Sequence, residues 1–187
     1  MTDLTLVTGN AHKLNEWQRM MPPGVSLKSV DIDLDELQSD DPIEIVTDKV
    51  KRAYESVGTP VIVEDVSAGL DELHGLPGPF IKFFIKALGQ GALYQLAGYQ
   101  DGSAATASCT AAYFDGTTLL TAQGDVNGTV VAPRQGSTFG FDVTFVPDGQ
   151  TLTYSEMDGA VKDAVSHRSI AISLLLKSME EHDLLKG

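Results

Sequence analysis

Hydrophobic and polar positions follow a pattern that divides the start of the chain into strand, helix and strand. An apolar run at 4–7 stops at a Thr-Gly-Asn turn, which predicts a buried strand. Over 11–21 the apolar positions recur at helical spacing, as Leu14 and Trp17 illustrate. Residues 26–34 return to the alternation of a second strand. This order is the one expected at the start of an α/β fold.

The next segment carries a full set of helix boundary signals. Asp41 is the predicted N-cap, Pro42 occupies the first helical position, and Glu44 completes a capping-box pattern. Apolar positions then recur at helical spacing, and Gly58 closes the pattern. We therefore expect a long amphipathic helix between Asp41 and Gly58.

The rest of the chain changes to a mostly β texture and ends in a helix. We expect, in chain order, a strand at 60–65 that ends on two acids, a loop at 74–79, helices at 80–89 and 92–98, strands at 104–114, 117–126 and 129–133 joined by Asp115-Gly116 and Asn127-Gly128 turns, a loop with a short strand at 139–149, and a closing helix capped by Ser166. The sequence contains no internal repeat or low-complexity linker. We therefore predict a single domain over 1–187, in which an α/β part and a β-hairpin part form two lobes.

Composition narrows the class of protein. The 187 residues carry 26 acidic and 13 basic side chains, a formal charge of −13, whereas duplex binding normally needs a basic face. The sequence has no run of the roughly 20 apolar residues of a membrane helix, and its start lacks a signal-peptide pattern. A single cysteine, Cys109, excludes an internal disulfide framework. We expect a cytoplasmic protein that binds neither nucleic acid nor membrane.

The turn after the first strand has the features of an anion site. Backbone N–H groups and the helix dipole favour a phosphate at the start of the helix, where Gly9 permits close approach and Lys13 adds positive charge. The pattern is not the longer Walker loop. A helix cap supplied by Asn10 explains the same residues. Both interpretations stay open from the turn alone.

Acidic side chains stand where two predicted strands end. Glu36 follows the second strand, and Glu64 and Asp65 close the strand at 60–65. Ligands of open α/β sheets gather beyond the carboxyl ends of strands, and Mg²⁺ combines hard oxygen ligands with substrate phosphate. Neighbours in a strand point to opposite faces, so we expect Glu64 and Asp65 to do different work, one at the cleft and the other on the opposite side or against a partner. Solvated acids at strand ends explain the spacing equally well.

Later stretches add cations, aromatic rings and a polar helix start. Lys49, Lys82 and Lys162 stand among apolar positions, where a lysine usually extends its amine to water. The FGFD stretch at 139–142 offers two rings and a carboxylate, which suit a nucleobase pocket or a protein core. Arg168 opposes the dipole of the last helix, which favours a ligand or a carboxylate partner. No nucleophile elbow occurs, so metal-assisted attack of water on phosphorus is the chemistry that remains.

Five stretches in one order resemble the inosine triphosphate pyrophosphatase family. They are TGNAHKLNE, IDLDELQ, VIVEDVSAGLDELHGLPGPFIKFF, VAPRQGSTFGFDVTFVPDG and AVSHRSIAI, and together they extend from about residue 4 to about residue 176. The resemblance implies an elongated mixed β-sheet flanked by helices, with a nucleotide cleft between two lobes. It implies that a homodimer hydrolyses ITP, dITP and XTP to the monophosphate and pyrophosphate, with Mg²⁺ as cofactor and Mn²⁺ as a substitute.

The same resemblance assigns roles to individual residues. Asp65 would activate water and, with Glu36, hold the metal, while Lys13 and Lys49 would stabilise charge on the phosphates. The residues implied in substrate binding are Thr8, Gly9, Asn10, Lys13, Lys82, Phe139, Gly140, Phe141, Asp142, Lys162, Ser166, His167 and Arg168. A site that donates hydrogen bonds to a 6-keto purine accepts hypoxanthine and leaves donors unpaired against adenine.

Two other functions fit parts of the pattern. A Maf-like pyrophosphatase of similar fold would act on pyrimidine or modified nucleotides, and the SHR segment at 166–168 argues against it. A non-catalytic nucleotide-binding protein would be favoured by loss of Glu36, Asp65 or Lys13, all of which are present.

Overall fold

The computed structural model describes residues 2–135 and 140–185. Its contacts group into two compact units. The first unit comprises Met1–Asp65, Cys109–Gly124 and Arg168–Gly187, and the second comprises Val66–Ser108 and Asp125–His167. Four elements belong in part to each unit: β3 (Val61–Leu70), β5 (Ser103–Phe114), β6 (Leu119–Val130) and α6 (His167–Glu181).

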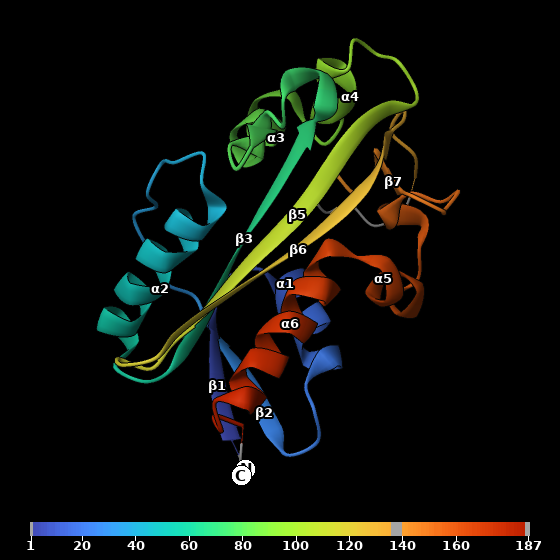
Figure 1. The fold of residues 1–187 in the computed structure, drawn as a ribbon. Helices are drawn as coiled ribbons and strands as arrows, with labels where there is room; N and C mark the ends of the chain where they lie inside the picture. The colour runs from blue at the N-terminus through green and yellow to red at the C-terminus, as the bar shows by residue number, and fades with distance from the viewer. Residues whose placement is uncertain (1, 136–139, 186–187) are drawn as a thin grey trace. The chain divides into compact units, whose positions relative to one another are not determined.

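The first unit begins as a parallel βαβαβ arrangement (Figure 1). Strand β1 (Thr2–Val7) pairs in parallel with β2 (Val25–Val30) along its whole length and with the start of β3. Helix α1 (Ala11–Met20) connects β1 to β2, and α2 (Pro42–Val57) connects β2 to β3. Parallel neighbours need such crossover connections, because the end of one strand and the start of the next lie at opposite edges of the sheet.

Alternate residues of β3 contact different helices. Ile62 belongs to a buried cluster with Trp17 of α1 and Ile172 of α6, whereas Val61 and Val63 pack with residues of α2. Helices α1 and α6 therefore cover one face of this part of the sheet, and α2 covers the other (Figure 1). By the same alternation Glu64 points to the α1 and α6 face, and Asp65 points to the α2 face.

The second unit combines short elements around an aromatic core. Its elements are η1 (Asp71–Leu73), β4 (Pro77–Gly78), α3 (Ile81–Leu88), α4 (Ala92–Leu96), β7 (Phe145–Pro147), η2 (Tyr154–Glu156) and α5 (Gly159–Val165). Phe141, Phe145 and Tyr154 are buried with Leu93 in one hydrophobic cluster. Gly69 lies directly against the carbonyl of Gly75, where any Cβ atom would overlap that oxygen.

The described residues contain one seven-stranded sheet with the main order β2-β1-β3-β5-β6-β7, and β4 pairs with β3. The sheet is mixed, because β4 and β7 pair antiparallel to β3 and β6. This confirms the predicted mixed α/β fold with helices flanking a central sheet. In the same described residues, no helix is long and apolar enough to cross a membrane. The predictions of a single domain over 1–187 and of a cleft between two lobes stay predictions.

Several element boundaries differ from those that the sequence suggested. The strand predicted at 60–65 continues to Leu70, so Glu64 and Asp65 lie within a strand and do not end it. The predicted Asn127-Gly128 turn is wrong, since both residues belong to β6. Gly128 pairs with Pro147, and a Cβ atom there would overlap the carbonyl of Val146. Glycine is required at this point for close strand contact.

Two further boundaries changed, and one was confirmed in detail. The second strand ends at Val30, four residues before its predicted end, and α5 was not predicted. Helix α2 begins after Asp41, whose carboxylate accepts hydrogen bonds from the N–H groups of Ile43 and Glu44. Gly58 ends it with a left-handed backbone, φ 74°. Local capping signals therefore placed α2 correctly.

Candidate functional site

The turn between β1 and α1 is organised by Asn10. Its side-chain oxygen accepts hydrogen bonds from the N–H groups of His12 and Lys13 at 2.9 and 3.3 Å. The Asn10 N–H donates to the hydroxyl of Thr8 at 3.1 Å. The prediction that Asn10 caps the helix is confirmed, and the cap fixes the backbone from which the Lys13 side chain extends. Gly9 lies against the carboxylate of Asp31, which a side chain at position 9 would displace.

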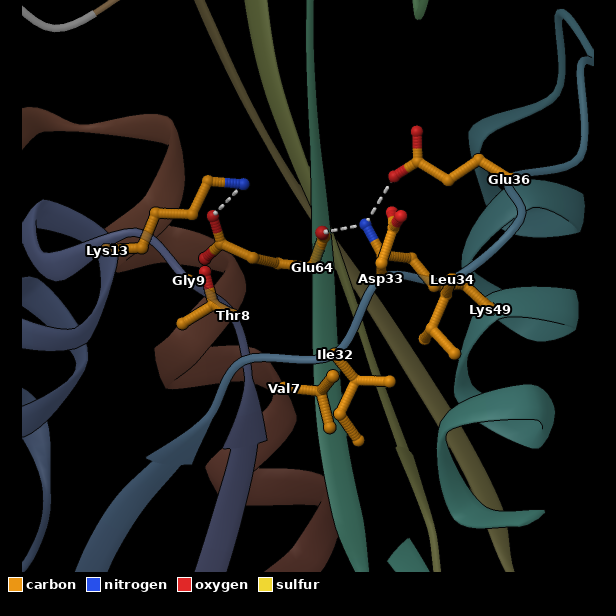
Figure 2. Close-up of a pocket in the computed structure, with 10 residues that line it drawn as sticks. All are labelled: Val7, Thr8, Gly9, Lys13, Ile32, Asp33, Leu34, Glu36, Lys49 and Glu64. Carbon is orange, nitrogen blue, oxygen red and sulfur yellow. Dashed lines mark hydrogen bonds and ion pairs between the residues drawn. The ribbon is translucent and has the colours of Figure 1, made fainter. Parts of the chain in front are cut away.

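A cavity of about 280 Å³ opens beside this turn, and it lies entirely in the first unit. Its lining residues come from the end of β1, the start of α1, the segment after β2, α2 and β3: Val7, Thr8, Gly9, Lys13, Ile32, Asp33, Leu34, Glu36, Lys49 and Glu64. Figure 2 shows Lys13 on one side of β3, with Glu36 and Lys49 on the other. The cavity therefore brings together two cations and acids from separate elements.

Lys49 is held at the cavity by two oxygen atoms. Its ammonium lies 2.8 Å from a carboxylate oxygen of Glu36 and donates to the backbone carbonyl of Glu64 at 3.3 Å (Figure 2). The side chain is 15 % exposed, so it does not extend freely to water. Of the two interpretations of this lysine, the structure supports a buried polar role over a solvated amine.

Glu64 contacts more of the polar side chains here than sequence reasoning anticipated. Its carboxylate lies 3.1 Å from the ammonium of Lys13, accepts from Arg168 Nε at 3.0 Å on both oxygens, and accepts from the indole N–H of Trp17 at 2.6 Å. Arg168 also donates to Glu16. We call these five residues, Lys13, Glu16, Trp17, Glu64 and Arg168, the Glu64 cluster.

Electrostatic interactions keep Glu64 and Arg168 ionised. Burial alone would raise the pKa of Glu64, but Arg168, Lys13 and Trp17 together hold that pKa well below its usual range. Burial alone would lower the pKa of Arg168, but the charges of Glu64 and Glu16 outweigh burial and raise that pKa above its usual value. The sequence left a ligand or a carboxylate open as the partner of Arg168, and the structure shows two carboxylates, those of Glu16 and Glu64. Glu64 was omitted from the predicted site, although strand alternation places it on the same face of the strand as Ile62.

Asp65 occupies the opposite face of β3 from Glu64. It is half-buried and, by strand alternation, faces the side of the sheet that α2 covers. Lys49 of α2 and its partner Glu36 belong to the same side. Asp65 is not among the residues that line the cavity described above. The structure therefore places Glu36 and Lys49 together at the cavity and leaves Asp65 outside its wall.

The second unit holds the other group of predicted residues. Lys162 of α5 lies 2.6 Å from the carboxylate of Asp142, and both side chains are almost fully buried. The His167 ring stands 5.9 Å from the Phe141 ring and 5.5 Å from the Tyr154 ring, between centroids. We call Phe141, Phe145, Tyr154 and His167 the aromatic cluster.

The second unit also contains Gly140, Ser166 and Lys82 of the predicted residues. Gly140 has a left-handed backbone, φ 58°, directly before Phe141. Ser166 is buried and extended between α5 and α6. Lys82 is exposed on α3, with its ammonium 5.1 Å from the centre of the Phe83 ring. Phe139 lies outside the described residues.

Tyr154 is a member of this group that sequence reasoning missed. Its hydroxyl donates to the backbone carbonyl of Val165 at 3.3 Å, and its ring lies 5.5 Å from the ammonium of Lys162. The only local signal for it was Glu156, three residues after Thr153, because these two residues form a capping box. That pattern marks the short helix but not the ring's contacts.

Comparison with known proteins identifies the class to which this fold and site belong. A model of the Ham1 family matches residues 4–178. Similar solved structures are a HAM1 protein from Coxiella burnetii, with TM-score 0.81 and 23 % identity, and the Staphylococcus aureus Ham1 protein, with TM-score 0.80 and 21 % identity; each match covers 97 % of this chain and 100 % of the other. At these identities the structural likeness speaks for the fold alone.

Sequence relatives are closer. The chain is 44 % identical to the inosine triphosphate pyrophosphatase of Tuber melanosporum over 184 residues, which is 96 % of this chain and 97 % of the relative. It is 42 % identical to the inosine triphosphate pyrophosphatase of Yarrowia lipolytica over 176 residues, 92 % of this chain and 93 % of the relative. The chain belongs to the Ham1 family.

Proposed function

We propose that this protein hydrolyses the non-canonical purine nucleoside triphosphates ITP, dITP and XTP to the nucleoside monophosphate and pyrophosphate, which cleanses the nucleotide pool. The observation that carries the proposal is the cavity of the first unit, where Lys13 and Lys49 face carboxylates beside parallel strands. Family membership and relatives named inosine triphosphate pyrophosphatase support this choice of reaction. The same comparisons do not favour a Maf-like activity or a non-catalytic role.

The first unit is proposed to bind the triphosphate. The N–H groups at the start of α1 and the ammonium of Lys13 supply positive potential, and Thr8, Gly9 and Asn10 shape the backbone there. Lys49 adds a second cation from α2. Both ammonium groups lie where charge would increase on the departing pyrophosphate, and such fixed charges lower the barrier to its departure.

Mg²⁺, with Mn²⁺ as a substitute, is the proposed cofactor. In the part of the chain that the structure describes, no group of three or more His, Cys, Asp or Glu side chains is arranged to hold a metal ion. Two carboxylates, those of Glu36 and Asp65, fit Mg²⁺, because that ion usually takes one or two carboxylates together with waters and phosphate oxygens. Glu36 supplies a partly exposed carboxylate in the cavity wall, and Asp65 is the proposed second ligand. When bound, the ion neutralises phosphate charge.

Asp65 is also the proposed base that orients or deprotonates the attacking water. A half-buried carboxylate on the face of β3 that α2 covers suits that role, because such a side chain is still partly accessible to water. Glu64 does not suit it, since hydrogen-bond and ion-pair contacts already occupy both of its oxygens. The two neighbouring acids are thus proposed to serve different purposes.

The second unit is proposed to recognise the base. His167, Lys162 and Ser166 supply hydrogen-bond donors, and Phe141 supplies an aromatic surface near His167. Arg168 stays a proposed substrate-binding residue from the family resemblance. A keto oxygen at position six accepts such hydrogen bonds, whereas the amino group of adenine leaves the donors unpaired. Lys82, Phe139, Gly140 and Asp142 stay proposed substrate-binding residues from the family resemblance.

The subunit number and the cellular compartment are further parts of the proposal. We propose a homodimer in the cytoplasm that binds neither nucleic acid nor membrane, and the formal charge of −13 supports the expectation for nucleic acid. Light scattering of the purified protein at several concentrations measures the subunit number directly. A monomer at every concentration would exclude the dimer.

Product analysis tests the proposed reaction. The protein is incubated with Mg²⁺ and ITP, dITP or XTP, and in parallel with ATP, GTP or dTTP, and the products are followed by ³¹P NMR. We expect IMP, dIMP or XMP with pyrophosphate from the first three substrates. Inosine diphosphate with orthophosphate as products, or faster turnover of dTTP than of ITP, would exclude the proposed reaction.

A further inference from the structure

Glu64 contacts three cations that come from three separate helices. Its two oxygens contact Lys13 of α1 and Arg168 of α6, and its backbone carbonyl accepts from Lys49 of α2. All of these contacts lie within the first unit. One residue of β3 therefore contacts each basic side chain that the proposed function places in that unit.

Burial makes the contacts of Glu64 strong. The side chains of Glu64 and Arg168 are each 1 % exposed, so water and salt do not screen the charges between them. Lys13 is 18 % exposed, and a lysine at such a position usually extends its ammonium to solvent. The contact of 3.1 Å with Glu64 directs that ammonium toward the cavity instead (Figure 2).

The orientation of the Glu64 carboxylate is itself fixed. The Trp17 indole donates to one oxygen at 2.6 Å, and Arg168 Nε donates to both at 3.0 Å. Glu16 accepts from the far side of the same guanidinium. Two carboxylates and two cations thus balance in charge, and the planar fork of arginine permits few other arrangements. A carboxylate with these contacts has little capacity left to bind a metal or take a proton.

We propose that Glu64 is a positioning residue, which holds Lys13 toward the triphosphate and fixes the guanidinium of Arg168. This inference rests on the proposed function. It gives a role to Glu64, the acid next to the proposed base Asp65. The proposed role of Glu64 is to contact the ligand-binding cations Lys13 and Arg168. Its removal therefore affects catalysis through the placement of Lys13 and Arg168.

Substitution of Glu64 tests the inference with an exposed control. Glu64→Gln keeps the shape but removes the charge, and Glu64→Asp keeps the charge on a shorter side chain. Since displacement of a group by about 1 Å costs on the order of 100-fold in rate, we expect kcat/KM for ITP to fall about 100-fold in Glu64→Gln, with partial recovery to about a tenfold loss in Glu64→Asp. Asp48→Asn, which breaks the exposed Asp48–Arg52 pair of α2, serves as control and keeps the parent rate.

A binding measurement separates positioning from support of the fold. Inorganic tripolyphosphate with Mg²⁺ carries no base, so as a competitive inhibitor of ITP hydrolysis it reports the phosphate end alone. We expect its inhibition constant to rise about tenfold in Glu64→Gln, as a misplaced Lys13 requires. Parent-like kcat/KM and inhibition constants in Glu64→Gln would overturn the inference.

The single tryptophan gives a test on the unaltered protein, which stands even if Glu64→Gln does not fold. Because Trp17 donates to Glu64 and Lys13 contacts the same carboxylate, engagement of Lys13 by tripolyphosphate changes the field at the indole. We expect Trp17 emission to change and to saturate with the inhibition curve, and Lys13→Met to abolish the change. Emission that stays constant while tripolyphosphate inhibits would refute the inference.

The two levels of proposal fail in different ways. A parent protein that releases no pyrophosphate from any nucleotide removes the proposed function, while the Trp17 titration with tripolyphosphate still reports the Lys13–Glu64 connection. A parent protein that hydrolyses ITP, beside a Glu64→Gln variant of equal activity, removes only the inference.

Discussion

The two groups of proposed site residues are built from different interactions. In the first unit, ion pairs and charged hydrogen bonds of 2.8–3.3 Å join Lys13, Lys49 and Arg168 to Glu36 and Glu64. In the second unit, rings packed at 5.3–6.1 Å between centroids surround His167, beside the Lys162–Asp142 ion pair. Fixed charges suit phosphates, which every nucleoside triphosphate shares, whereas flat rings and aimed donors suit one base over another.

This difference predicts a division of labour. Changes in the first unit should alter the turnover of every triphosphate by the same factor. Changes in the aromatic cluster should alter the ratio between substrates. The substitutions below test that division, in decreasing order of expected effect.

The largest effect is expected from Asp65→Asn. An amide cannot accept the proton of the attacking water, so we expect kcat for ITP to fall about 1,000-fold, within the usual range for loss of a general base. Steady-state pyrophosphate release measures the rate, and thermal unfolding checks that the fold is intact. Turnover at the parent rate would show that Asp65 is not the base.

Lys13→Met should reduce turnover of all triphosphates together. Loss of one fixed cation from the phosphate end is expected to lower kcat/KM about 100-fold for ITP and ATP alike, because their phosphates are identical. Lys28→Met, at an exposed lysine of β2, is the matched control and keeps the parent value. A loss confined to ITP would contradict the division between the units.

His167→Phe should change selectivity more than rate. A phenylalanine ring at position 167 can still pack between Phe141 and Tyr154, but it lacks the N–H of the imidazole. We expect kcat/KM for ITP to fall about 30-fold, the cost of one hydrogen bond to a buried polar group, with little change for ATP. His182→Phe, at an exposed histidine, is the control. Equal losses for ITP and ATP would remove His167 from base recognition.

The smallest effect is expected from Asp41→Ala. The Asp41 carboxylate caps α2, the helix that carries Lys49, and loss of such a cap costs about 1 kcal/mol of stability. Urea denaturation should give a lower midpoint with an unchanged slope, and ITP turnover should stay within about twofold of the parent. A large loss of turnover without a change in stability would mean that Asp41 acts in the site itself.

Local sequence signals predicted much of the fold. The boundaries of α2 follow from Asp41, Pro42 and Gly58, because capping and left-handed closure involve only neighbouring residues. The Asn127-Gly128 turn failed for the opposite reason. The dipeptide favours a turn locally, but pairing of Gly128 with Pro147 of β7 decides its conformation.

The same distinction explains the site. Lys13 lies in the first turn of α1, Glu36 in the segment after β2 and Lys49 within α2, and the structure brings all three to one cavity. The Glu64 cluster was not predicted because its contacts join residues that are far apart in the chain. The sequence separation is 104 residues for Arg168 and Glu64 and 47 residues for Trp17 and Glu64. Such pairings depend on the packing of α1 and α6 on one face of β3, which no local pattern reveals.

The preference for a 6-keto purine is the central claim, and one ratio tests it. Initial rates of pyrophosphate release with Mg²⁺ give kcat/KM for ITP and for ATP on the unaltered protein. A site whose donors pair with the keto oxygen and are left unpaired by adenine should favour ITP by about 100-fold or more. Equal values for the two nucleotides, or a higher value for ATP, would contradict the account.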